Sequence, residues 1–344
     1  MKTSLSASQF IAPLPFKDLL SGGEFDAASL GAVLSTASHV KSDVRAFAGA
    51  LAGRVVCMMF EKPSLRTRVS FEAGTARLGG HAIYFDMAGT RLGERESVRD
   101  AAGTLERMVD MIVCRTHAHA PLAELARHSR VPVVNALCER FHPCQALADV
   151  MTIKEALGDV RGAKVVYLGD GNNVAHSLAI VASTLGADLT LVCPKGYALE
   201  AAVVGEAQAR STDSGGSVTV TDALDAVAGA DILYADTWIS MGDEAEKARR
   251  LKAFTPYQVN AAMMSRAGAN ARFMHCLPAK RGQEVTDDVI DSPASIVFDQ
   301  AENRMHAQNA LMLHMLCPGR DLHKTRTAAP PTSRPREVGA PLTH

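Results

Sequence analysis

The sequence predicts an α/β protein with two domains, each a parallel sheet enclosed between two layers of helices. Three observations predict this fold class. The chain has 344 residues, which is enough for about two domains at roughly 150 residues each. Short apolar runs alternate along it with helix-length segments, as in repeated strand–helix units. Several of these runs are continuously apolar, which is typical of strands covered on both faces.

The expected strands fall into two series, and each strand is a short run rich in β-branched and other apolar residues. The first series is 54–60, 81–86, 111–115 and 131–136. The second series is 163–170, 187–194, 217–221, 230–236, 271–277 and 294–298. The helix-length segments between and after them include 66–79, 142–157, 173–186 and 299–316.

The boundary between the two domains is expected in the segment 142–162. This segment predicts a long helix that ends in a glycine–aspartate turn before the second series of strands begins. We therefore predict a first domain over 1–150 and a second over 151–298, with the helix of 299–317 returning to the first. The proline-rich tail of 318–344 has no apolar period and is predicted to be disordered.

The composition excludes several classes of protein. Lys and Arg number 36 and Asp and Glu number 37, so no overall basic field exists to hold nucleic acid or an anionic membrane. No apolar run approaches the ~18–20 residues of a membrane span, and we expect no secretory signal at the start of the chain. Seven cysteines, an odd number in a chain of this length, favour reduced thiols and a cytoplasmic location.

The strongest chemical signal is the segment Ser64-Leu65-Arg66-Thr67-Arg68, which follows the first expected strand. A helix is expected to begin here, so free backbone N–H groups, two hydroxyls and two guanidinium groups come together on one turn. The simpler interpretation is a serine N-cap with two solvated arginines. Two arginines in the first turn oppose the helix dipole, however, and a bound anion removes that conflict. We therefore predict an oxyanion site.

A second candidate site is the start of the next long helix, at His142 and Gln145. These side chains share a helix face, and a neutral imidazole and an amide can both donate to a polarised carbonyl oxygen. The simpler interpretation of His142 is a cap or a buried polar group. A metal site is not predicted, because the nearby cysteines and histidines match no zinc spacing. They are Cys114, His117, His119, Cys138 and Cys144.

Two loops at strand ends suit a small polar substrate. The loop 169–174 resembles half of a dinucleotide fingerprint, but the acidic residue expected after the next strand is missing. Asn173 is therefore predicted to face a small substrate. The segment that begins at Asp236 offers an acid, the only Trp and a turn with Ser240 and Met241, which together suit a cationic ligand. Its simpler interpretation is an Asx-type turn with a packed Trp.

Two more residues belong to this set of candidates. Cys276 lies in a His-Cys-Leu-Pro motif at a strand end, where a thiol can act as a nucleophile or position an amine. Arg304 lies near the start of the last expected helix, in a Glu-Asn-Arg motif. It offers a further guanidinium group for an oxyanion.

Together these motifs resemble the aspartate/ornithine carbamoyltransferase family, and within it the ornithine-specific branch. The resemblance covers the chain from about Phe16 to Leu316, with five motifs in the family's order and approximate spacing. They are Ser-x-Arg-Thr-Arg at 64–68, His-Pro-Cys-Gln at 142–145, Asp-Thr-Trp-Ile-Ser-Met-Gly at 236–242, His-Cys-Leu-Pro at 275–278 and Glu-Asn-Arg at 302–304. Any one of them alone is a weak signal.

The resemblance implies two α/β domains with the active site in the cleft between them. It implies transfer of the carbamoyl group of carbamoyl phosphate to the δ-amino group of L-ornithine, giving L-citrulline and phosphate in arginine metabolism. The family is usually built as a trimer, or a multiple of trimers, that shares its active sites across subunits. The resemblance also implies that the reaction needs no metal and no cofactor.

The resemblance also implies a role for each site residue. The catalytic residues would be Arg66, Arg115, His142, Asp236 and Cys276. Carbamoyl phosphate would be bound by Ser64, Leu65, Arg66, Thr67, Arg115, His142, Gln145, Cys276, Leu277 and Arg304. Ornithine would be bound by Asn173, Asp236, Ser240 and Met241.

Two positions depart from the commonest family pattern. Leu65 lies where a Thr is frequent, and Arg91 lies where the family often has a Gln that reaches carbamoyl phosphate.

The closest alternative function is carbamoyl transfer to another amine, such as putrescine or N-acetylornithine. A non-catalytic relative would be expected to lack Arg66, Arg115 or His142, and all three are present. An NAD oxidoreductase would be supported only by the glycine-rich loop.

Overall fold

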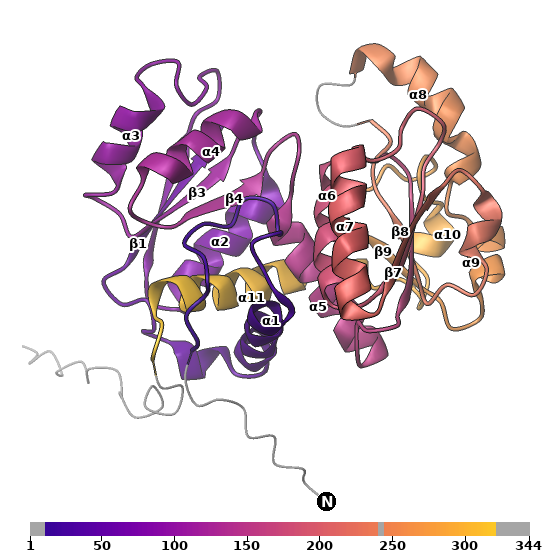
Figure 1. The fold of residues 1–344 in the computed structure, drawn as a ribbon, viewed down its shortest axis with the longest axis horizontal. Coiled ribbons are helices and arrows are strands. Elements are labelled where there is room, and N and C mark those ends of the chain that lie inside the picture. Colours follow the sequence, from indigo (N-terminus) through magenta and orange to yellow (C-terminus); the bar gives the residue numbers. More distant parts are fainter. Residues whose placement is uncertain (1–10, 240–243, 321–344) are drawn as a thin grey trace, which may run out of the picture.

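The computed structural model describes residues 11–239 and 244–320, which form two lobes, each built on one parallel sheet (Figure 1). The first sheet consists of β1 (Val55–Phe60), β2 (His81–Asp86), β3 (Met111–Arg115) and β4 (Val133–Leu137). The second consists of β5 (Lys164–Leu168), β6 (Asp188–Val192), β7 (Ser217–Thr221), β8 (Ile232–Ala235) and β9 (Arg272–His275). Their strand orders are β2-β1-β3-β4 and β7-β6-β5-β8-β9, with every pairing between these strands parallel. The predicted α/β class is confirmed.

Helices fill the connections between the strands. Those of the first half of the chain are α1 (Ala27–Ser42), α2 (Leu65–Arg77), α3 (Val98–Leu105), α4 (His119–His128) and α5 (Pro143–Leu157). Those of the second half are α6 (Asn173–Thr184), α7 (Ala201–Ser214), α8 (Lys247–Phe254), α9 (Ala261–Ala267), α10 (Asp287–Ile290) and α11 (Val297–Leu316). Short 3₁₀ turns occur at η1 (Val44–Phe47), η2 (Leu224–Val227), η3 (Glu244–Glu246) and η4 (Thr255–Tyr257).

Both faces of each sheet are covered, because successive side chains of a strand point to opposite faces. In β1, Val56, Met58 and Phe60 pack in the same apolar cluster as residues of α1, α2, α5 and α11. Cys57 and Met59 pack instead with residues of α3 and α4. The second sheet lies in the same way between α6 and α7 on one face and α9 and α10 on the other. Each lobe therefore has three layers.

Helix α5 joins the two lobes. It packs against α11 on one side and against α6 of the second lobe on the other. One continuous cluster of buried apolar side chains runs from the first sheet through Leu147 and Val150 of α5 to Leu178 of α6 and Val165 of β5. The shared core fixes how the strand ends of the two sheets face each other.

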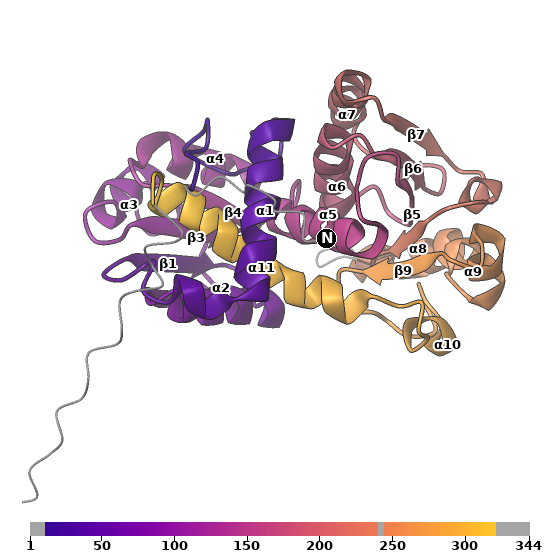
Figure 2. The ribbon, with the colours of Figure 1, turned by 90° about the horizontal axis from the view of Figure 1, so that it is seen from below.

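Helix α11 brings the end of the chain back to the first lobe. It begins beside β9 and then packs against α5, α1 and α2 (Figure 2). Where the described chain begins and ends, the N–H of Ile11 donates to the carbonyl oxygen of Arg320 (3.0 Å). The N–H of Gly319 donates to the carbonyl oxygen of Ile11 (2.8 Å).

The expected elements match the observed ones to within two residues at either end, with one exception. The strand expected over 294–298 is wrong. Only Ser295 bridges to Phe273, through hydrogen bonds on either side of that residue, and α11 begins two residues later at Val297. The end of the apolar run, Val297 and Phe298, therefore belongs to the first turn of a helix, and only Ser295 and Ile296 lie between that helix and the turn that ends at Ala294.

Two expectations concern the ends of the chain and membranes. The tail predicted to be disordered over 318–344 lies outside the described residues from position 321 onwards. In the ranges that are described, no helix combines the length and the apolar character that crossing a membrane requires.

Candidate active site

A cavity of about 880 Å³ lies between the two lobes. Its lining follows the ends of β1, β3 and β4 in the first lobe and of β5, β8 and β9 in the second, the edge at which α/β sheets bind ligands. Every predicted site residue that the structure describes lines it: Ser64, Leu65, Arg66, Thr67, Arg115, His142, Gln145, Asn173, Asp236, Cys276, Leu277 and Arg304. The other two, Ser240 and Met241, lie outside the described residues.

The first turn of α2 forms one wall of the cavity. Ser64 is the N-cap of this helix, since its Oγ accepts a hydrogen bond from the N–H of Thr67 (3.3 Å) and its O–H donates to Thr67 Oγ1 (2.9 Å). The cap interpretation is therefore correct for Ser64. The N–H groups of Leu65 and Arg66 precede the first intrahelical hydrogen bond, so they can serve an anion in the cavity.

The two arginines of this turn lie in different surroundings. Arg66 is partly buried and lines the cavity, and burial lowers the pKa of its guanidinium group. Arg68 is exposed, with Nε donating to Glu72 Oε1 (3.1 Å) and its guanidinium carbon 3.8 Å from the centroid of the Tyr84 ring. Only Arg66 of this pair is placed to meet a ligand in the cavity.

Arg115 is the last residue of β3, and a bulge turns it towards the cavity. Cys114 pairs with Asn135 but Arg115 pairs with Leu137, so β4 holds one extra residue at this point. A bulge of this kind bends the strand and redirects a side chain. Arg115 is buried, and its Nε has no hydrogen-bond partner within the described parts of the chain.

Arg304 of α11 completes a cluster of three guanidinium groups with Arg66 and Arg115. Its Nη1 donates to Gln145 Oε1 (2.8 Å) and its Nη2 to Thr67 Oγ1 (2.8 Å). Burial, followed by the charges of Arg304 and Arg66, lowers the pKa of Arg115 to about 10. Like charges repel strongly when they are withdrawn from water, so this cluster favours a bound anion.

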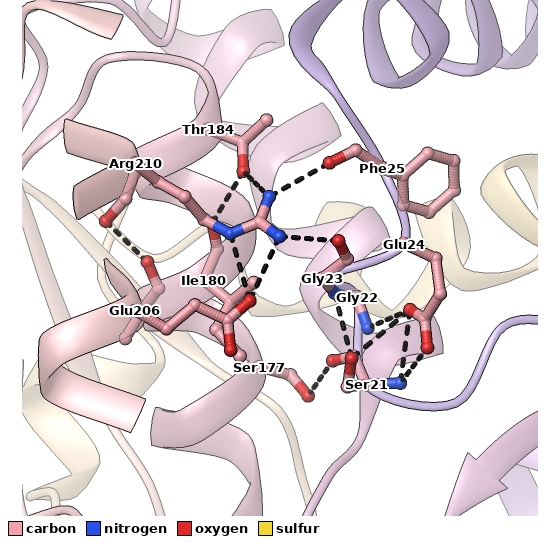
Figure 3. A network of polar contacts seen from close by, with 12 residues as sticks. Ser21, Gly22, Gly23, Glu24, Phe25, Ser177, Ile180, Thr184, Glu206 and Arg210 are labelled. Carbon is pink, nitrogen blue, oxygen red and sulfur yellow. Dashed lines mark hydrogen bonds and ion pairs between the residues drawn. The ribbon is translucent and has the colours of Figure 1, made fainter. Parts of the chain in front are cut away.

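The backbone of His142 is held by Ser177, which is itself bound to the start of the chain. Its N–H donates to Ser177 Oγ of α6 (2.9 Å), and the Ser177 hydroxyl donates to the carbonyl oxygen of Ser21 (2.9 Å). Figure 3 shows Ser177 beside the segment that contains Ser21, with Arg210 of α7 holding the same segment through the carbonyl oxygen of Phe25 (2.9 Å). The second lobe and the start of the chain therefore fix where α5 begins.

We expect the imidazole of His142 to be neutral at pH 7 and to stay neutral as the pH falls through the ordinary histidine pKa. Burial, and then the charges of Arg304, Arg115 and Arg66, hold its pKa well below the ordinary value of 6.5. In the unfolded chain the imidazole keeps its ordinary pKa. As the pH falls below roughly 6.5, the unfolded state therefore binds the proton before the folded state does. The free energy of unfolding decreases as a result.

The measurement is an NMR titration of the histidine ring protons, with His142→Gln identifying the resonance. A flat titration curve is expected, and a midpoint near the ordinary pKa would contradict the prediction.

Asp236, directly after β8, accepts three hydrogen bonds. Its Oδ1 accepts from the Cys276 thiol (2.9 Å) and from the N–H of Thr237 (2.7 Å), and its Oδ2 accepts from Asn172 Nδ2 (2.7 Å). Asn172 is itself the N-cap of α6, with Oδ1 accepting from the N–H of Val174 (2.9 Å). A fixed carboxylate therefore stands in the second lobe opposite the arginines of the first.

Burial, followed by the charge of Asp236, raises the pKa of the Cys276 thiol well above its ordinary value. A nucleophilic cysteine acts as the thiolate. The thiol of Cys276 instead donates to Asp236, so of the two roles considered for this residue the geometry favours positioning over nucleophilic attack.

Asp236, His275 and Cys276 form the one group of potential metal ligands found in the described residues, with ligand atoms within 4.8 Å of one another. This group differs from the cysteines and histidines weighed from the sequence. All three side chains have protein partners. His275 Nδ1 accepts from the N–H of Leu277 (2.8 Å), so its Nε2 carries the proton that faces Glu284 Oε1 (3.2 Å). We assign no metal to the group.

Two sequence expectations are refined by the structure. The amide nitrogen of Asn173 donates to the carbonyl oxygen of Cys138 (2.6 Å), which leaves its side-chain oxygen for a ligand. Arg91 does not line the large cavity. It lies at a separate cavity of about 350 Å³ and approaches Glu94 at 4.0 Å.

Several lining residues were missed from the sequence. Lys62 is buried directly before the turn that leads to α2, and burial, followed by the charge of Arg115, lowers its pKa. Its position beside the oxyanion motif is the signal that indicates it. Arg250 of α8 donates to Asp170 Oδ2 (2.8 Å) and to the carbonyl oxygen of Trp238 (3.0 Å). No local pattern joins Asp170 to Arg250, because they are distant in the chain.

Comparison with known proteins yields matches over both lobes. Residues 17–155 match the family described as aspartate/ornithine carbamoyltransferase, carbamoyl-P binding domain. Residues 161–315 match the one described as aspartate/ornithine carbamoyltransferase, Asp/Orn binding domain.

Individual relatives are similar over nearly their whole length. An ornithine carbamoyltransferase of Vibrio sp. (strain 2693) is 46% identical over 300 residues, 87% of this chain and 99% of the relative. An anabolic ornithine carbamoyltransferase of Pyrococcus furiosus is 47% identical over 305 residues, 88% of this chain and 97% of the relative. A solved ornithine carbamoyltransferase structure from Pyrococcus furiosus superposes with a TM-score of 0.85 at 46% identity, covering 89% of this chain and 98% of that one.

Proposed function

We propose a mechanism from the premise that the chain belongs to the aspartate/ornithine carbamoyltransferase family. The protein is an enzyme of carbamoyl transfer, from carbamoyl phosphate to the δ-amino group of L-ornithine, with L-citrulline and phosphate as products. The anabolic relative supports a place in arginine biosynthesis. The site residues below are assigned from the geometry of the cavity.

One observation supports the assignment most strongly. Three guanidinium groups, those of Arg66, Arg115 and Arg304, lie around the N-terminus of α2 together with the hydroxyls of Ser64 and Thr67. Such a set suits a doubly charged phosphate, because charged donors and a helix N-terminus both stabilise anions. The opposite wall offers the carboxylate of Asp236, which suits an amine. A cavity of this volume holds both substrates together.

In the first half of the site, Ser64, the N–H groups of Leu65 and Arg66, and Thr67 would bind the phosphate. Arg115, His142 and Arg304 would lie around the carbamoyl group, with the neutral imidazole donating to its carbonyl oxygen. The amide of Gln145 is turned so that its oxygen, rather than its nitrogen, lies beside Arg304. We therefore assign it to accept from the carbamoyl N–H₂, in place of the donation expected from the sequence. Cys276 and Leu277 would close this end of the pocket.

Transfer then proceeds by addition and elimination. The neutral δ-amine forms a C–N bond to the carbamoyl carbon, and the carbonyl oxygen becomes an oxyanion that Arg115 and His142 stabilise. The C–O bond to phosphate breaks as the carbonyl re-forms, with Arg66 and the N-terminus of α2 stabilising the departing charge. The amine proton leaves with the phosphate. Holding both substrates in one cavity supplies much of the acceleration.

The acceptor is proposed to be ornithine, with Asp236 and Cys276 near its δ-amine and Asn173 near its polar end. Ser240 and Met241 are part of the same proposal from the sequence. Putrescine and N-acetylornithine are the alternatives, and the relatives named as ornithine carbamoyltransferases favour ornithine.

The test is citrulline formation by the purified protein from carbamoyl phosphate and ornithine. N-acetylornithine, putrescine, lysine and aspartate are run beside it at equal concentration. A preference for ornithine of about 10²-fold or more in kcat/KM is expected, because a pocket built for a polar group discriminates strongly against a substrate that lacks it. Arg66→Ala protein purified in the same way controls for contaminating host enzyme. A preference for another acceptor would contradict the acceptor assignment.

The domain roles are proposed on the same grounds. Residues 1–150, with the returning helix over 299–317, would form the carbamoyl phosphate domain, and 151–298 would form the ornithine domain. The packing of α11 against α1, α2 and α5 supports this grouping.

We propose that the enzyme is a homotrimer or a multiple of trimers. The outer surface of α2 and the edge strand β2 beside it expose Leu65 (74%), Val69 (52%), Ile83 (42%) and Phe85 (50%), and large apolar side chains gathered beside an active site suit contact with a second copy. Light scattering is expected to give at least three times the chain mass of 36.5 kDa. A monomer at micromolar concentration would contradict the proposal.

A cytoplasmic location is proposed as well. All seven cysteines lie in the described residues and are unpaired, five of them buried. Reduced thiols of this kind are typical of cytoplasmic proteins.

A further inference from the structure

A buried carboxylate lies behind the carbamoyl phosphate site and has no role in the mechanism above. Asp149 of α5 is fully buried, one helical turn after Gln145. Burial raises the pKa of its carboxyl group to about 7. A carboxyl group removed from water is costly unless its oxygens are satisfied by donors. The arrangement of those donors indicates what the residue does.

Three donors from three elements meet at Asp149. Its Oδ1 accepts from Gln145 Nε2 of α5 (2.8 Å) and from Gln300 Nε2 of α11 (2.7 Å). Its Oδ2 accepts from the hydroxyl of Tyr234 in β8 (3.1 Å). The carboxylate therefore stands where α5, α11 and the second sheet meet, immediately behind the cavity.

The first of these contacts decides how Gln145 presents its amide. An amide can turn either end towards a partner. Because Asp149 accepts only from the nitrogen, Gln145 Oε1 must lie on the opposite side, where it accepts from Arg304 Nη1 (2.8 Å). Arg304 in turn donates to Thr67 Oγ1 (2.8 Å), which also accepts from Ser64. The orientation set at Asp149 thus reaches the oxyanion wall of the cavity.

The second contact extends to the other side of the site. Gln300 also has its nitrogen on Asp149, so its Oε1 accepts from the N–H of His275 (2.9 Å). His275 is the last residue of β9, directly before Cys276 and Leu277. The same carboxylate thus fixes two amides that support opposite sides of the pocket for the carbamoyl group.

We propose that Asp149 is a positioning residue of the carbamoyl phosphate site, which orients the amides of Gln145 and Gln300 by accepting from both. It acts through these amides and touches neither substrate. The inference rests on the proposed function for the identity of the ligand. It predicts that removing the hydrogen-bond acceptor at position 149 weakens binding of the carbamoyl group more than binding of the phosphate.

The experiment compares two substitutions of Asp149 that differ in one property. Asp149→Asn keeps the Oδ1 acceptor for both glutamines, and its new N–H₂ group can donate to Tyr234, whose hydroxyl reverses. Asp149→Leu keeps a side chain of similar size but removes the acceptor. For each variant, kcat, the KM of carbamoyl phosphate and the inhibition constant of inorganic phosphate are measured.

Asp149→Leu is expected to lower kcat/KM for carbamoyl phosphate by about 10²-fold, which is the typical effect of a misplaced reacting group. The inhibition constant of phosphate should change by less than about threefold, since the phosphate donors of α2 keep their places. Asp149→Asn should retain activity within about fivefold of the wild type. Tyr234→Phe is the matched control: it removes a contact to Asp149 but leaves both glutamines bound, so near-normal kinetics are expected.

Three results would overturn the proposal. They are unchanged kinetics in Asp149→Leu, an equal rise in the phosphate inhibition constant and the carbamoyl phosphate KM, and an Asp149→Asn variant as defective as Asp149→Leu. If Asp149→Leu is not recovered folded, Asp149→Ser replaces it, because its shorter side chain admits water to the donors but fixes neither amide.

The outcome is separable from the proposed function. If the wild type itself makes no citrulline, the proposed function fails. Binding of carbamoyl phosphate and of inorganic phosphate, measured by calorimetry on the same variants, still decides whether Asp149 positions the site.

Discussion

Replacing Arg66 by alanine is expected to lower kcat/KM for carbamoyl phosphate by about 10³-fold. Arg66 lines the cavity from the first turn of α2, where its guanidinium group and the helix N-terminus face the same ligand. A charge-assisted donor to a departing phosphate acts most strongly in the transition state, so kcat should fall as well as affinity. Initial rates of citrulline formation over a range of carbamoyl phosphate concentrations give both constants.

The matched control for this prediction is Arg68→Ala, two residues along the same helix. Arg68 is paired with Glu72 and lies against Tyr84, outside the cavity. Its removal should change kcat/KM by less than about fivefold, because Arg68 does not line the cavity and the loss of an exposed ion pair costs little stability. Both variants should melt close to the wild type. Near-normal turnover by Arg66→Ala, or an equal loss in Arg68→Ala, would refute the assignment of the phosphate site to this cavity wall.

Replacing Asp236 by asparagine is expected to lower kcat/KM for ornithine by about 10²–10³-fold, with little change in the affinity for carbamoyl phosphate. The carboxylate of Asp236 accepts from Cys276, from Thr237 and from Asn172. An amide in its place removes the charge that faces the amine and sets an N–H₂ group against existing donors. The KM values of the two substrates, measured separately, distinguish loss of the acceptor site from general damage.

Asp188→Asn serves as the control for Asp236→Asn. Asp188 begins β6 of the same sheet, at the edge opposite the cavity, and its Oδ1 accepts from the Ser217 hydroxyl (2.7 Å). It should leave both KM values unchanged. If Asp236→Asn raised the KM of carbamoyl phosphate as much as that of ornithine, the separation of the two substrates between the lobes would be wrong.

The sequence predicted the parallel strands well because their signal is local. The runs 56–60 and 111–114 are apolar throughout, and only a strand covered on both faces buries every one of those side chains. The same rule misled at 294–298, where a short run rich in apolar residues ends in the first two residues of α11, Val297 and Phe298. A short apolar run does not distinguish a strand from one turn of a buried helix. The number of residues between the preceding turn and the helix start determines whether a strand can form.

Some features of the candidate site were likewise evident from the local sequence, and others depend on how the chain packs. The motif at 64–68 identified the cavity wall proposed to bind phosphate. A helix start, two hydroxyls and two arginines occur there within five residues, so the chemistry could be read from the local sequence. It could not show that Arg66 enters the cavity while Arg68 turns to Glu72 and Tyr84. That difference depends on which face of α2 packs against the rest of the lobe. Lys62 was missed although it lies beside this motif, since nothing within the motif shows that the folded chain buries this side chain at the cavity.

The sequence by itself determined the fold class, the carboxyl-edge location of the site and the residue types that the chemistry requires. These follow from periodicities and motifs that span fewer than about twenty residues. The tertiary structure decided the rest. Arg304 reaches Gln145 and Thr67 only because α11 returns across the first lobe, and Asp149 orients two amides only because α5, α11 and β8 meet around it. The direction of a hydrogen bond between distant segments is set by packing, for which no local pattern exists.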